Sequence, residues 1–171
     1  ITLETWPMPT TRVAYPRATI AYDEKGQELF RTTALWVLMD THTRAMILPG
    51  KSGVDVAGTV LGTELKAPGG LPAGAFTNSV FRTVSYSDLD VNGHMNNTRY
   101  MDWVADLLDS VFHKDHFPKA FTVCYLSEAR EGQTLRQETV YDPVSNTLQA
   151  EFRREKDQGK LERVFAAKLE Y

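Results

Sequence analysis

The chain has 171 residues, a formal net charge of −3 at neutral pH and 42% hydrophobic residues. A chain of this size can bury roughly two-thirds of its unfolded surface, which indicates a soluble globular protein. The slightly acidic balance gives no support for non-specific nucleic-acid binding, which requires a basic surface. No apolar run approaches the ~20 residues that a bilayer-spanning helix needs. We therefore expect neither a nucleic-acid partner nor a membrane span.

The chain contains one cysteine, Cys124. One cysteine cannot form an internal disulfide and is typical of a reducing compartment, so we predict a cytoplasmic protein. The first residues alternate like a strand, with no preceding methionine and no secretory signal pattern. We therefore expect that the chain is truncated at its N-terminal end.

Residues 1–48 are predicted to form β-strands. Apolar and polar side chains alternate over residues 11–22, and a second run, rich in β-branched and aromatic residues, covers 29–40. A short third run ends this region. The glycine- and proline-rich residues 49–77 are predicted to form a linker with little regular structure, apart from a short helix near 53–57.

Residues 78–171 are predicted to form a second unit around one helix. From Tyr100 to Phe112 the apolar residues recur three and four positions apart, which indicates a single amphipathic helix. Three polar residues can cap its start: Asn96, Asn97 and Thr98. Strands are predicted on both sides of the helix, at 81–85, 119–130, 134–142, 147–155 and 161–171. This pattern predicts an α+β fold with an antiparallel sheet wrapped around the helix.

Residues 85–100, SYSDLDVNGHMNNTRY, contain an unusual density of short polar side chains. Asp88 to Gly93 match the opening of an EF-hand calcium loop, but Arg99 stands at the twelfth position, where a bidentate glutamate belongs. A zinc site would need more ligands than His94 and one aspartate, and no second histidine has useful spacing. We therefore predict no metal and no other cofactor.

His94 favours a catalytic function for this loop. It precedes the predicted helix by a few residues, close to the backbone N–H groups at a helix N-terminus. Such groups can stabilise an oxyanion while a histidine or a carboxylate moves protons, which suits attack on an acyl carbonyl. The chain has no G-x-S-x-G elbow, so a serine hydrolase is disfavoured. The alternative is a loop that serves only as a turn and a helix cap.

Three motifs in the chain resemble those of one enzyme family. DLDVNGHMNN at 88–97, followed by Tyr100 and Trp103, resembles the D-L-D-V-N-x-H-V-N-N-x-x-Y-x-x-W signature of plant and bacterial acyl-ACP thioesterases. FTVCYLSE at 121–128 resembles the F-T-L-x-Y-R-R-E strand of the same family. ALWVLMDTHTR at 34–44 resembles its S-x-W-V-M-M-N-x-x-T-R segment. The resemblance therefore covers both β-rich halves of the chain.

The resemblance implies a double hotdog fold, in which each repeat is a long helix cradled by an antiparallel sheet. Residues 1–48 would be the sheet portion of an incomplete first repeat, and residues 78–171 the second repeat, which carries the catalytic residues. The implied activity is hydrolysis of fatty acyl-ACP to free fatty acid. The implied partner is acyl carrier protein, with the enzyme a monomer or a homodimer.

The resemblance also implies catalytic functions for Asp90, Asn92, His94 and Glu128. We expect water to be the nucleophile, with Glu128 or His94 taking its proton. Asn92 would bind the thioester carbonyl or position the water, and Asp90 would orient its neighbours. Backbone N–H groups at residues 96–99 would stabilise the oxyanion.

Further residues are expected to contact the substrate or its carrier. The expected substrate contacts are Asn96, Asn97, Trp36 and Met39. The first two are also candidates for helix caps, and the last two for ordinary core positions. Basic residues that could receive an acidic carrier protein are Arg12, Arg17, Arg44 and Lys51.

The chain departs from the family at one position. Plant members carry a cysteine directly after the strand glutamate, where this chain has Ala129. Cys124 lies five residues earlier, or about 16 Å along a strand, and is expected to be a buried, inert thiol. Covalent catalysis by cysteine is therefore disfavoured.

Two other functions are compatible with these residues. The first is a single-hotdog acyl-CoA thioesterase, since the loops of that type also carry an aspartate followed by G-H-x-N. The second is a non-catalytic hotdog protein that binds acyl groups. The paired β-rich halves argue against the first, and the complete proton-transfer set argues against the second.

Overall fold

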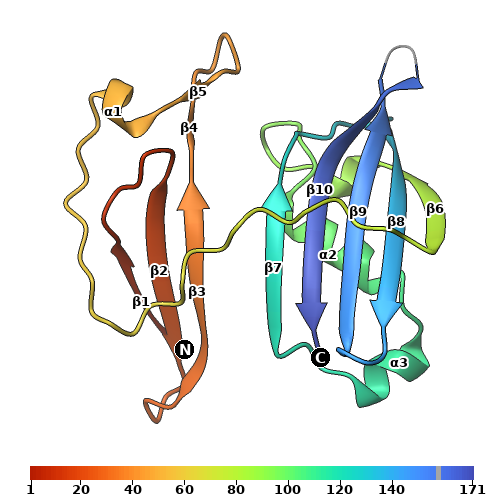
Figure 1. Cartoon of the computed structure of the whole chain (residues 1–171), viewed down its shortest axis with the longest axis horizontal. Helices are drawn as coiled ribbons and strands as arrows, with labels where there is room; N and C mark the ends of the chain where they lie inside the picture. The colour runs from red at the N-terminus through yellow and green to blue at the C-terminus, as the bar shows by residue number, and fades with distance from the viewer. Residues whose placement is uncertain (157–158) are drawn as a thin grey trace. The chain divides into compact units, whose positions relative to one another are not determined.

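The computed structural model describes residues 1–156 and 159–171. The chain forms two compact units, Ile1–Gly69 and Gly70–Tyr171 (Figure 1). The finer division into a first repeat at 1–48, a linker at 49–77 and a second repeat at 78–171 remains a prediction.

The first unit is built on a three-stranded antiparallel sheet. Its strands lie in the order β1 (Thr2–Pro7), β2 (Tyr15–Tyr22) and β3 (Glu28–Trp36). Two short strands, β4 (Leu38–Met39) and β5 (Met46–Ile47), pair after it. The strands predicted before residue 48 are therefore confirmed, although the run predicted at 29–40 is divided between β3 and β4.

Residues beyond β5 pack against this sheet. Trp6, Ala18 and Thr33 are neighbours across the three strands and so project from the same face. On that face Trp6 Nε1 donates to Glu64 Oε1 at 3.0 Å, and Thr33 Oγ1 donates to the Leu65 carbonyl at 2.9 Å. The predicted linker therefore lacks regular structure here but is bound to the sheet by side-chain hydrogen bonds.

The short helix predicted near residues 53–57 lies earlier in the chain. Helix α1 is Pro49–Ser52. Pro49 starts it because its fixed φ suits the first helical position, and Gly53 ends it with a φ of 70°. The prediction was wrong because the glycine that terminates the helix was placed inside it.

The second unit contains a five-stranded antiparallel sheet in the order β6-β8-β9-β10-β7. Its strands are β6 (Asn78–Thr83), β7 (Ala120–Tyr125), β8 (Thr134–Asp142), β9 (Thr147–Glu155) and β10 (Leu161–Glu170). The last three strands form a meander, and β7 pairs with β10, so β6 and β7 are the two edges. This sheet and the helix packed against it confirm the α+β hotdog fold.

The strand predicted at 119–130 ends early. The N–H groups of Leu126 and Ser127 both donate to the carbonyl of Val164, at 2.9 and 3.1 Å, beside a register shift between Arg163 and Phe165. The regular ladder cannot continue past this shared acceptor. Glu128 therefore lies on a loop, and the prediction that it ends a strand is wrong.

The single helix predicted from Tyr100 to Phe112 is two helices, α2 (Asn97–Ala105) and α3 (Ser110–Asp115). The break occurs because the carboxylate of Asp109 accepts the Phe112 N–H at 2.8 Å and starts a new helix. The apolar spacing does not reveal the break, since side chains on both sides of it pack against the same core. Within the described part of the chain, no helix reaches the length and apolarity that a membrane crossing requires.

The core of the second unit lies between α2 and the sheet. Trp103 and Val104 are fully buried on α2, and they meet Phe152 and Phe165 from the central strands. Trp103 lies 6.1 Å from the ring of Phe152, centroid to centroid. This packing fixes the start of α2, where the polar loop lies.

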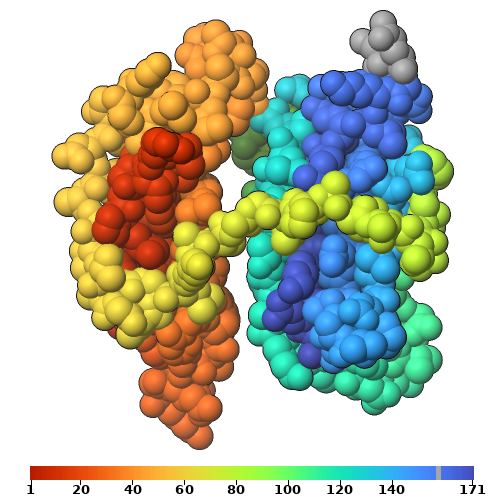
Figure 2. All heavy atoms as spheres, viewed as in Figure 1, coloured from red at the N-terminus to blue at the C-terminus, as the bar shows by residue number. Residues whose placement is uncertain are grey.

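The opposite face of the sheet is polar and partly covered. Arg153 and Arg163 bind the buried carboxylate of Glu151 on this face. Figure 2 shows the residues that follow Gly70 lying across these strands. Arg163 Nη2 donates to the Leu71 carbonyl at 2.9 Å, which binds this segment to the sheet.

Candidate active site

The polar loop before α2 is attached to the core through Asp88. This residue ends the short 3-10 helix η1 (Tyr86–Asp88) and is 8% exposed. Its carboxylate accepts the Ser85 N–H at 2.9 Å and the Trp103 Nε1–H at 3.3 Å. The contact with Trp103 explains why the loop has a fixed position relative to the helix. Asp88 is therefore a structural residue rather than a free carboxylate.

Residues 90–94 form a tight turn. The Asp90 N–H donates to the His94 carbonyl at 2.8 Å, and Gly93, with a φ of 71°, donates to the Asp90 carbonyl at 3.0 Å. The Asp90 carboxylate accepts the N–H groups of Asn92 and His94, at 2.8 and 3.3 Å. The hydrogen bond from the Asn92 backbone is the main cause that lowers the pKa of Asp90. An ionised Asp90 thus orders the turn that presents His94.

The predicted oxyanion donors at the start of α2 are mostly engaged within the protein. The Asn96 N–H donates to the Asp88 carbonyl at 2.8 Å, while the N–H groups of Thr98 and Arg99 donate to the side chain and carbonyl of Asn96, both at 2.9 Å. Only the N–H of Asn97 forms no hydrogen bond among the described residues. The prediction of several donors at 96–99 is therefore wrong, because the capping interactions use three of them.

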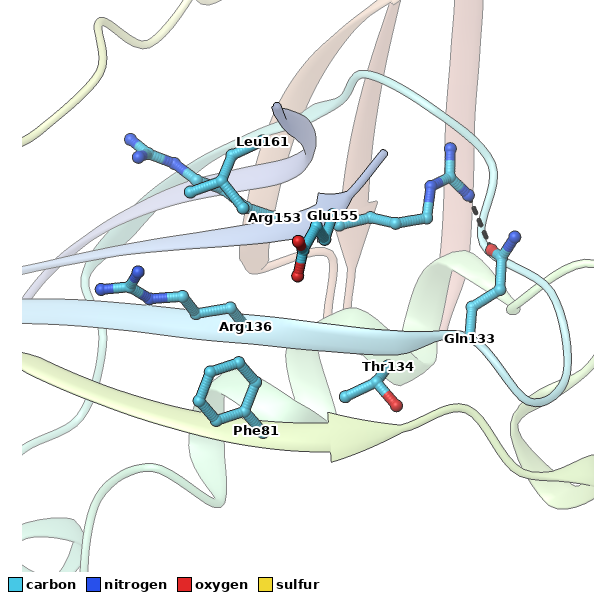
Figure 3. A pocket seen from close by; sticks show the side chains of 8 residues that line it. Phe81, Gln133, Thr134, Arg136, Arg153, Glu155 and Leu161 are labelled. Atoms are coloured by element: carbon cyan, nitrogen blue, oxygen red, sulfur yellow. Dashed lines mark hydrogen bonds between the residues drawn. The ribbon is translucent and has the colours of Figure 1, made fainter. Parts of the chain in front are cut away.

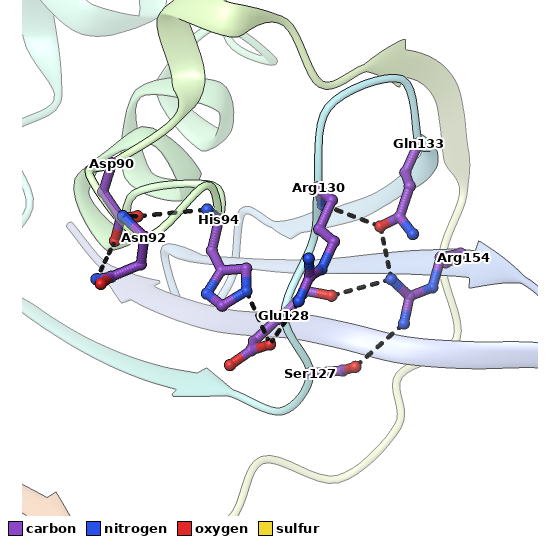
Figure 4. A network of polar contacts seen from close by, with 8 residues as sticks. All are labelled: Asp90, Asn92, His94, Ser127, Glu128, Arg130, Gln133 and Arg154. Carbon is purple, nitrogen blue, oxygen red and sulfur yellow. Dashed lines mark hydrogen bonds and ion pairs between the residues drawn. The ribbon is translucent and has the colours of Figure 1, made fainter. Parts of the chain in front are cut away.

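His94 and Glu128 meet at the start of α2. His94 Nε2 lies 3.2 Å from Glu128 Oε2, although the two residues come from separate loops (Figure 4). The histidine side chain is 20% exposed and the glutamate side chain 41% exposed, so the pair is accessible from solvent. Arg130 Nη2 lies 4.0 Å from the same carboxylate oxygen. A carboxylate and an imidazole in this contact can take and pass a proton.

A backbone hydrogen bond joins the two loops directly. The N–H of Met95, next to His94, donates to the carbonyl of Ala129, next to Glu128, at 2.8 Å. Ala129 is fully buried and offers no nucleophile, and the only cysteine, Cys124, lies on β7. The contact between His94 and Glu128 is therefore set by the backbone as well as by the side chains.

Aromatic side chains pack between the start of α2 and the sheet. Tyr100 stacks on Phe165 with ring centroids 4.9 Å apart, and the Tyr125 hydroxyl donates to the Asn97 carbonyl at 3.1 Å. Burial raises the pKa of Tyr100 to about 12, against the opposing hydrogen bond from the Ala129 backbone. Tyr100 is therefore neutral at physiological pH and does not supply the base.

The other predicted substrate contacts belong to both units of the chain. Asn96 caps α2 with its side chain, and Asn97 is the exposed first residue of that helix. Trp36 and Met39 belong to the first unit, where they are 62% and 46% exposed. The substrate-binding functions of these residues remain predictions.

Sequence reasoning missed Arg154. This residue of β9 donates to the Glu128 carbonyl at 2.9 Å and to Gln133 Oε1 at 2.6 Å (Figure 4). It lies in a correctly predicted strand, but no motif distinguishes it from the other basic residues. A motif search is limited to short stretches, and these partners come together only through the fold.

A hollow of about 440 Å³ lies on the sheet face opposite α2 (Figure 3). Its lining residues are Phe81, Gln133, Thr134, Arg136, Arg153, Arg154, Glu155 and Leu161. Neither His94 nor Glu128 belongs to this lining. The hollow is therefore separate from the candidate active site, although Arg154 and Gln133 border both.

Two family models match the chain. The model for the acyl-ACP thioesterase C-terminal domain matches residues 75–169, and the model for the acyl-ACP thioesterase N-terminal domain matches residues 1–48. His94 and Glu128 both lie within residues 75–169.

Comparison with an individual relative also indicates the acyl-ACP thioesterase family. The chain is 32% identical over 124 residues to the dodecanoyl-[acyl-carrier-protein] hydrolase of Cinnamomum camphora, an alignment that covers 67% of the chain and 32% of the relative. The chain thus spans about a third of the length of the curated relatives it matches.

Solved structures show the same fold over nearly the whole chain. An acyl-ACP thioesterase from Bacteroides thetaiotaomicron matches with a TM-score of 0.80 at 24% identity, covering 98% of this chain and 67% of that one. A 12:0-ACP thioesterase from Umbellularia californica matches with a TM-score of 0.74 at 26% identity, covering 98% and 64%.

Proposed function

The chain belongs to the acyl-ACP thioesterase family, and from this we propose that it hydrolyses fatty acyl-ACP to a free fatty acid and ACP. The observation that carries the proposal is the 3.2 Å contact between His94 Nε2 and Glu128 Oε2 at the start of α2. A protein that only binds acyl groups has no need of such a proton-transfer pair. The contact therefore supports hydrolysis over simple binding.

In the proposed reaction, water attacks the thioester carbonyl. The Glu128–His94 pair takes the proton of the water and returns one to the departing thiolate of the carrier's prosthetic group. The side-chain amide of Asn92, adjoining Asp90 in the turn, binds the carbonyl or the water. The unengaged N–H of Asn97 donates to the oxyanion.

Family membership supports a proposal for the partner. We propose acyl carrier protein as the partner, because relatives named above are an acyl-ACP hydrolase and an acyl-ACP thioesterase. The oligomeric state is proposed to be a monomer or a homodimer. The single cysteine supports a reducing compartment such as the cytoplasm, whereas the curated relatives are named as chloroplastic.

Thiol release from matched acyl-ACP and acyl-CoA substrates tests the proposal. Medium- to long-chain thioesters of both carriers would be offered to the intact protein. We expect turnover on ACP thioesters to exceed turnover on CoA thioesters at each chain length. The same panel with His94→Ala should lose turnover by about 10²–10⁴-fold, the usual contribution of a proton-transfer group.

Two results would reject the proposal in different ways. Equal or faster turnover on CoA thioesters would assign the chain to acyl-CoA hydrolysis. Tight binding of acyl-ACP without any thiol release would assign it to acyl binding. Calorimetric titration with the same acyl-ACP panel provides the binding measurement.

A further inference from the structure

The loop that carries Glu128 does not pair with the sheet in a regular ladder. After the shared acceptor Val164, residues 128–130 lie outside any strand. An exposed glutamate on such a loop would sample many positions, yet catalysis requires the carboxylate to remain beside His94. Misplacement by about 1 Å can cost 10²-fold in rate. Some group must therefore fix this loop.

We propose that Arg154 is the positioning residue that holds the Glu128 loop in its reactive geometry, an inference that rests on the proposed function. Its guanidinium reaches three parts of the loop (Figure 4). Nη1 donates to the Glu128 carbonyl at 2.9 Å and to Gln133 Oε1 at 2.6 Å, while Nη2 donates to Ser127 Oγ at 3.2 Å. Gln133 Oε1 also accepts the Arg130 N–H at 3.0 Å, which closes the loop on itself.

The remaining donors of Arg154 fix the guanidinium itself. Nε donates to Glu162 Oε2 at 3.2 Å, and Nη2 also contacts this oxygen. The five N–H groups of an arginine are thus all engaged, two by the neighbouring strand and three by the loop. Burial raises the pKa of Glu162, but hydrogen bonds from Lys156 and Arg154 outweigh this and lower it. An ionised Glu162 therefore anchors a side chain that is only 17% exposed.

A lysine could not perform this function. Lysine has three donors on a flexible stem, whereas the planar arginine fork binds the loop and the strand at the same time. The Glu128 carbonyl is bound by Arg154 and the next carbonyl, that of Ala129, by the Met95 N–H. Arg154 also binds Ser127 Oγ, so its contacts lie on both sides of the Glu128 Cα and fix the position from which the Glu128 side chain extends toward His94.

The test combines kinetics with spectroscopy of the His94 ring. Arg154→Gln would be made in the natural chain and in the Glu128→Gln background. If Arg154 acts through Glu128, its loss should lower kcat by about 10–100-fold in the natural chain and change KM little. In the Glu128→Gln background the same change should cost less than about threefold, because coupled residues are not additive. A purely structural residue would cost the same factor in both backgrounds.

The spectroscopic readout does not depend on activity. In ¹H–¹³C spectra, Arg154→Gln should move the His94 ring signals toward the positions they take in Glu128→Gln. Unchanged His94 ring signals would overturn the positioning function. So would an equal loss of kcat from Arg154→Gln in the natural chain and in the Glu128→Gln background. If the natural chain hydrolyses no thioester, the proposed function fails, and the ring signals alone decide whether Arg154 positions Glu128.

Two variants complete the design. Arg154→Gln combined with Glu162→Gln removes both charges of this pair, so a folding failure caused by leaving Glu162 with Lys156 as its remaining partner is avoided. Arg163→Gln is the matched control, since Arg163 binds Glu151 and the Leu71 carbonyl and does not contact the Glu128 loop. Arg163→Gln should leave both kcat and the His94 ring signals unchanged.

Discussion

Gly93 turns the chain between Asp90 and His94 with a φ of 71°. A side chain at this position meets no atom within 4 Å, so the demand on glycine is conformational rather than steric. We predict that Gly93→Ala destabilises the protein by about 1–2 kcal/mol, the cost of a left-handed conformation for a residue with a Cβ. Urea unfolding, monitored by circular dichroism, measures the change in the free energy of unfolding.

Gly50 provides the control for that substitution. It lies in α1 without a positive φ, and a Cβ there also meets nothing within 4 Å. Gly50→Ala should therefore not destabilise the protein, because alanine is favoured over glycine at a helical position by up to about 1 kcal/mol. Equal destabilisation by both substitutions would contradict the account of the turn.

The titration of Asp90 tests the electrostatics of the same turn. The hydrogen bond from the Asn92 backbone is the main cause that lowers its pKa, so the ionised form stabilises the folded turn. This stabilisation is present above the unfolded pKa of about 3.9 and is lost as the pH falls through the lower folded value. The carboxyl ¹³C signal of Asp90 should titrate below the value in an unfolded peptide, together with the His94 amide signal. A titration midpoint of Asp90 at or above the peptide value would refute the claim that the turn lowers its pKa.

Sequence motifs mark residues that lie close together in the chain. The motifs of the family resemblance contain His94 and Glu128, which the fold brings into contact. Arg154 could not be found in this way, because its partners lie on two separate segments, the Glu128 loop and β10, and nothing local marks it. The catalytic functions assigned to Asp90, Asn92, His94 and Glu128 remain predictions.

At the scale of elements, the start of α3 depends on one side chain. Asp109 accepts the Phe112 N–H at 2.8 Å and so caps the helix. Asp109→Ala should lower the free energy of unfolding by about 1 kcal/mol, a typical cost for losing an N-cap. Asp115→Ala, at the other end of the helix, should be neutral or slightly stabilising because an acid there opposes the helix dipole. Thermal unfolding provides the measurement, and an equal loss of stability in both variants would contradict the capping function.

Element boundaries were less predictable than element types. The apolar spacing from Tyr100 to Phe112 correctly indicated helix, but it runs through the break because both helices face one core. The strand predicted at 119–130 ends at Tyr125, where two N–H groups share one carbonyl. Such tertiary hydrogen bonds have no signal in local sequence patterns.

At the scale of the whole molecule, strand alternation and one long apolar helix pattern were sufficient for the α+β class. The hotdog arrangement required the family resemblance, since spacing alone does not specify that β7 pairs with β10. The five-stranded sheet then places β6 and β7 at its edges and leaves the start of α2 beside the Glu128 loop. The fold thus explains why residues distant in sequence form one candidate site.

Glu128→Gln tests the proposed hydrolysis of acyl-ACP at this site. The measurement is the rate of thiol release from acyl-ACP, compared with Glu131→Gln, an exposed glutamate of the same loop. We expect the rate of thiol release to fall by about 10²–10⁴-fold in Glu128→Gln and to stay unchanged in Glu131→Gln. Undiminished turnover by a folded Glu128→Gln variant would contradict this expectation and leave His94 to act without this carboxylate.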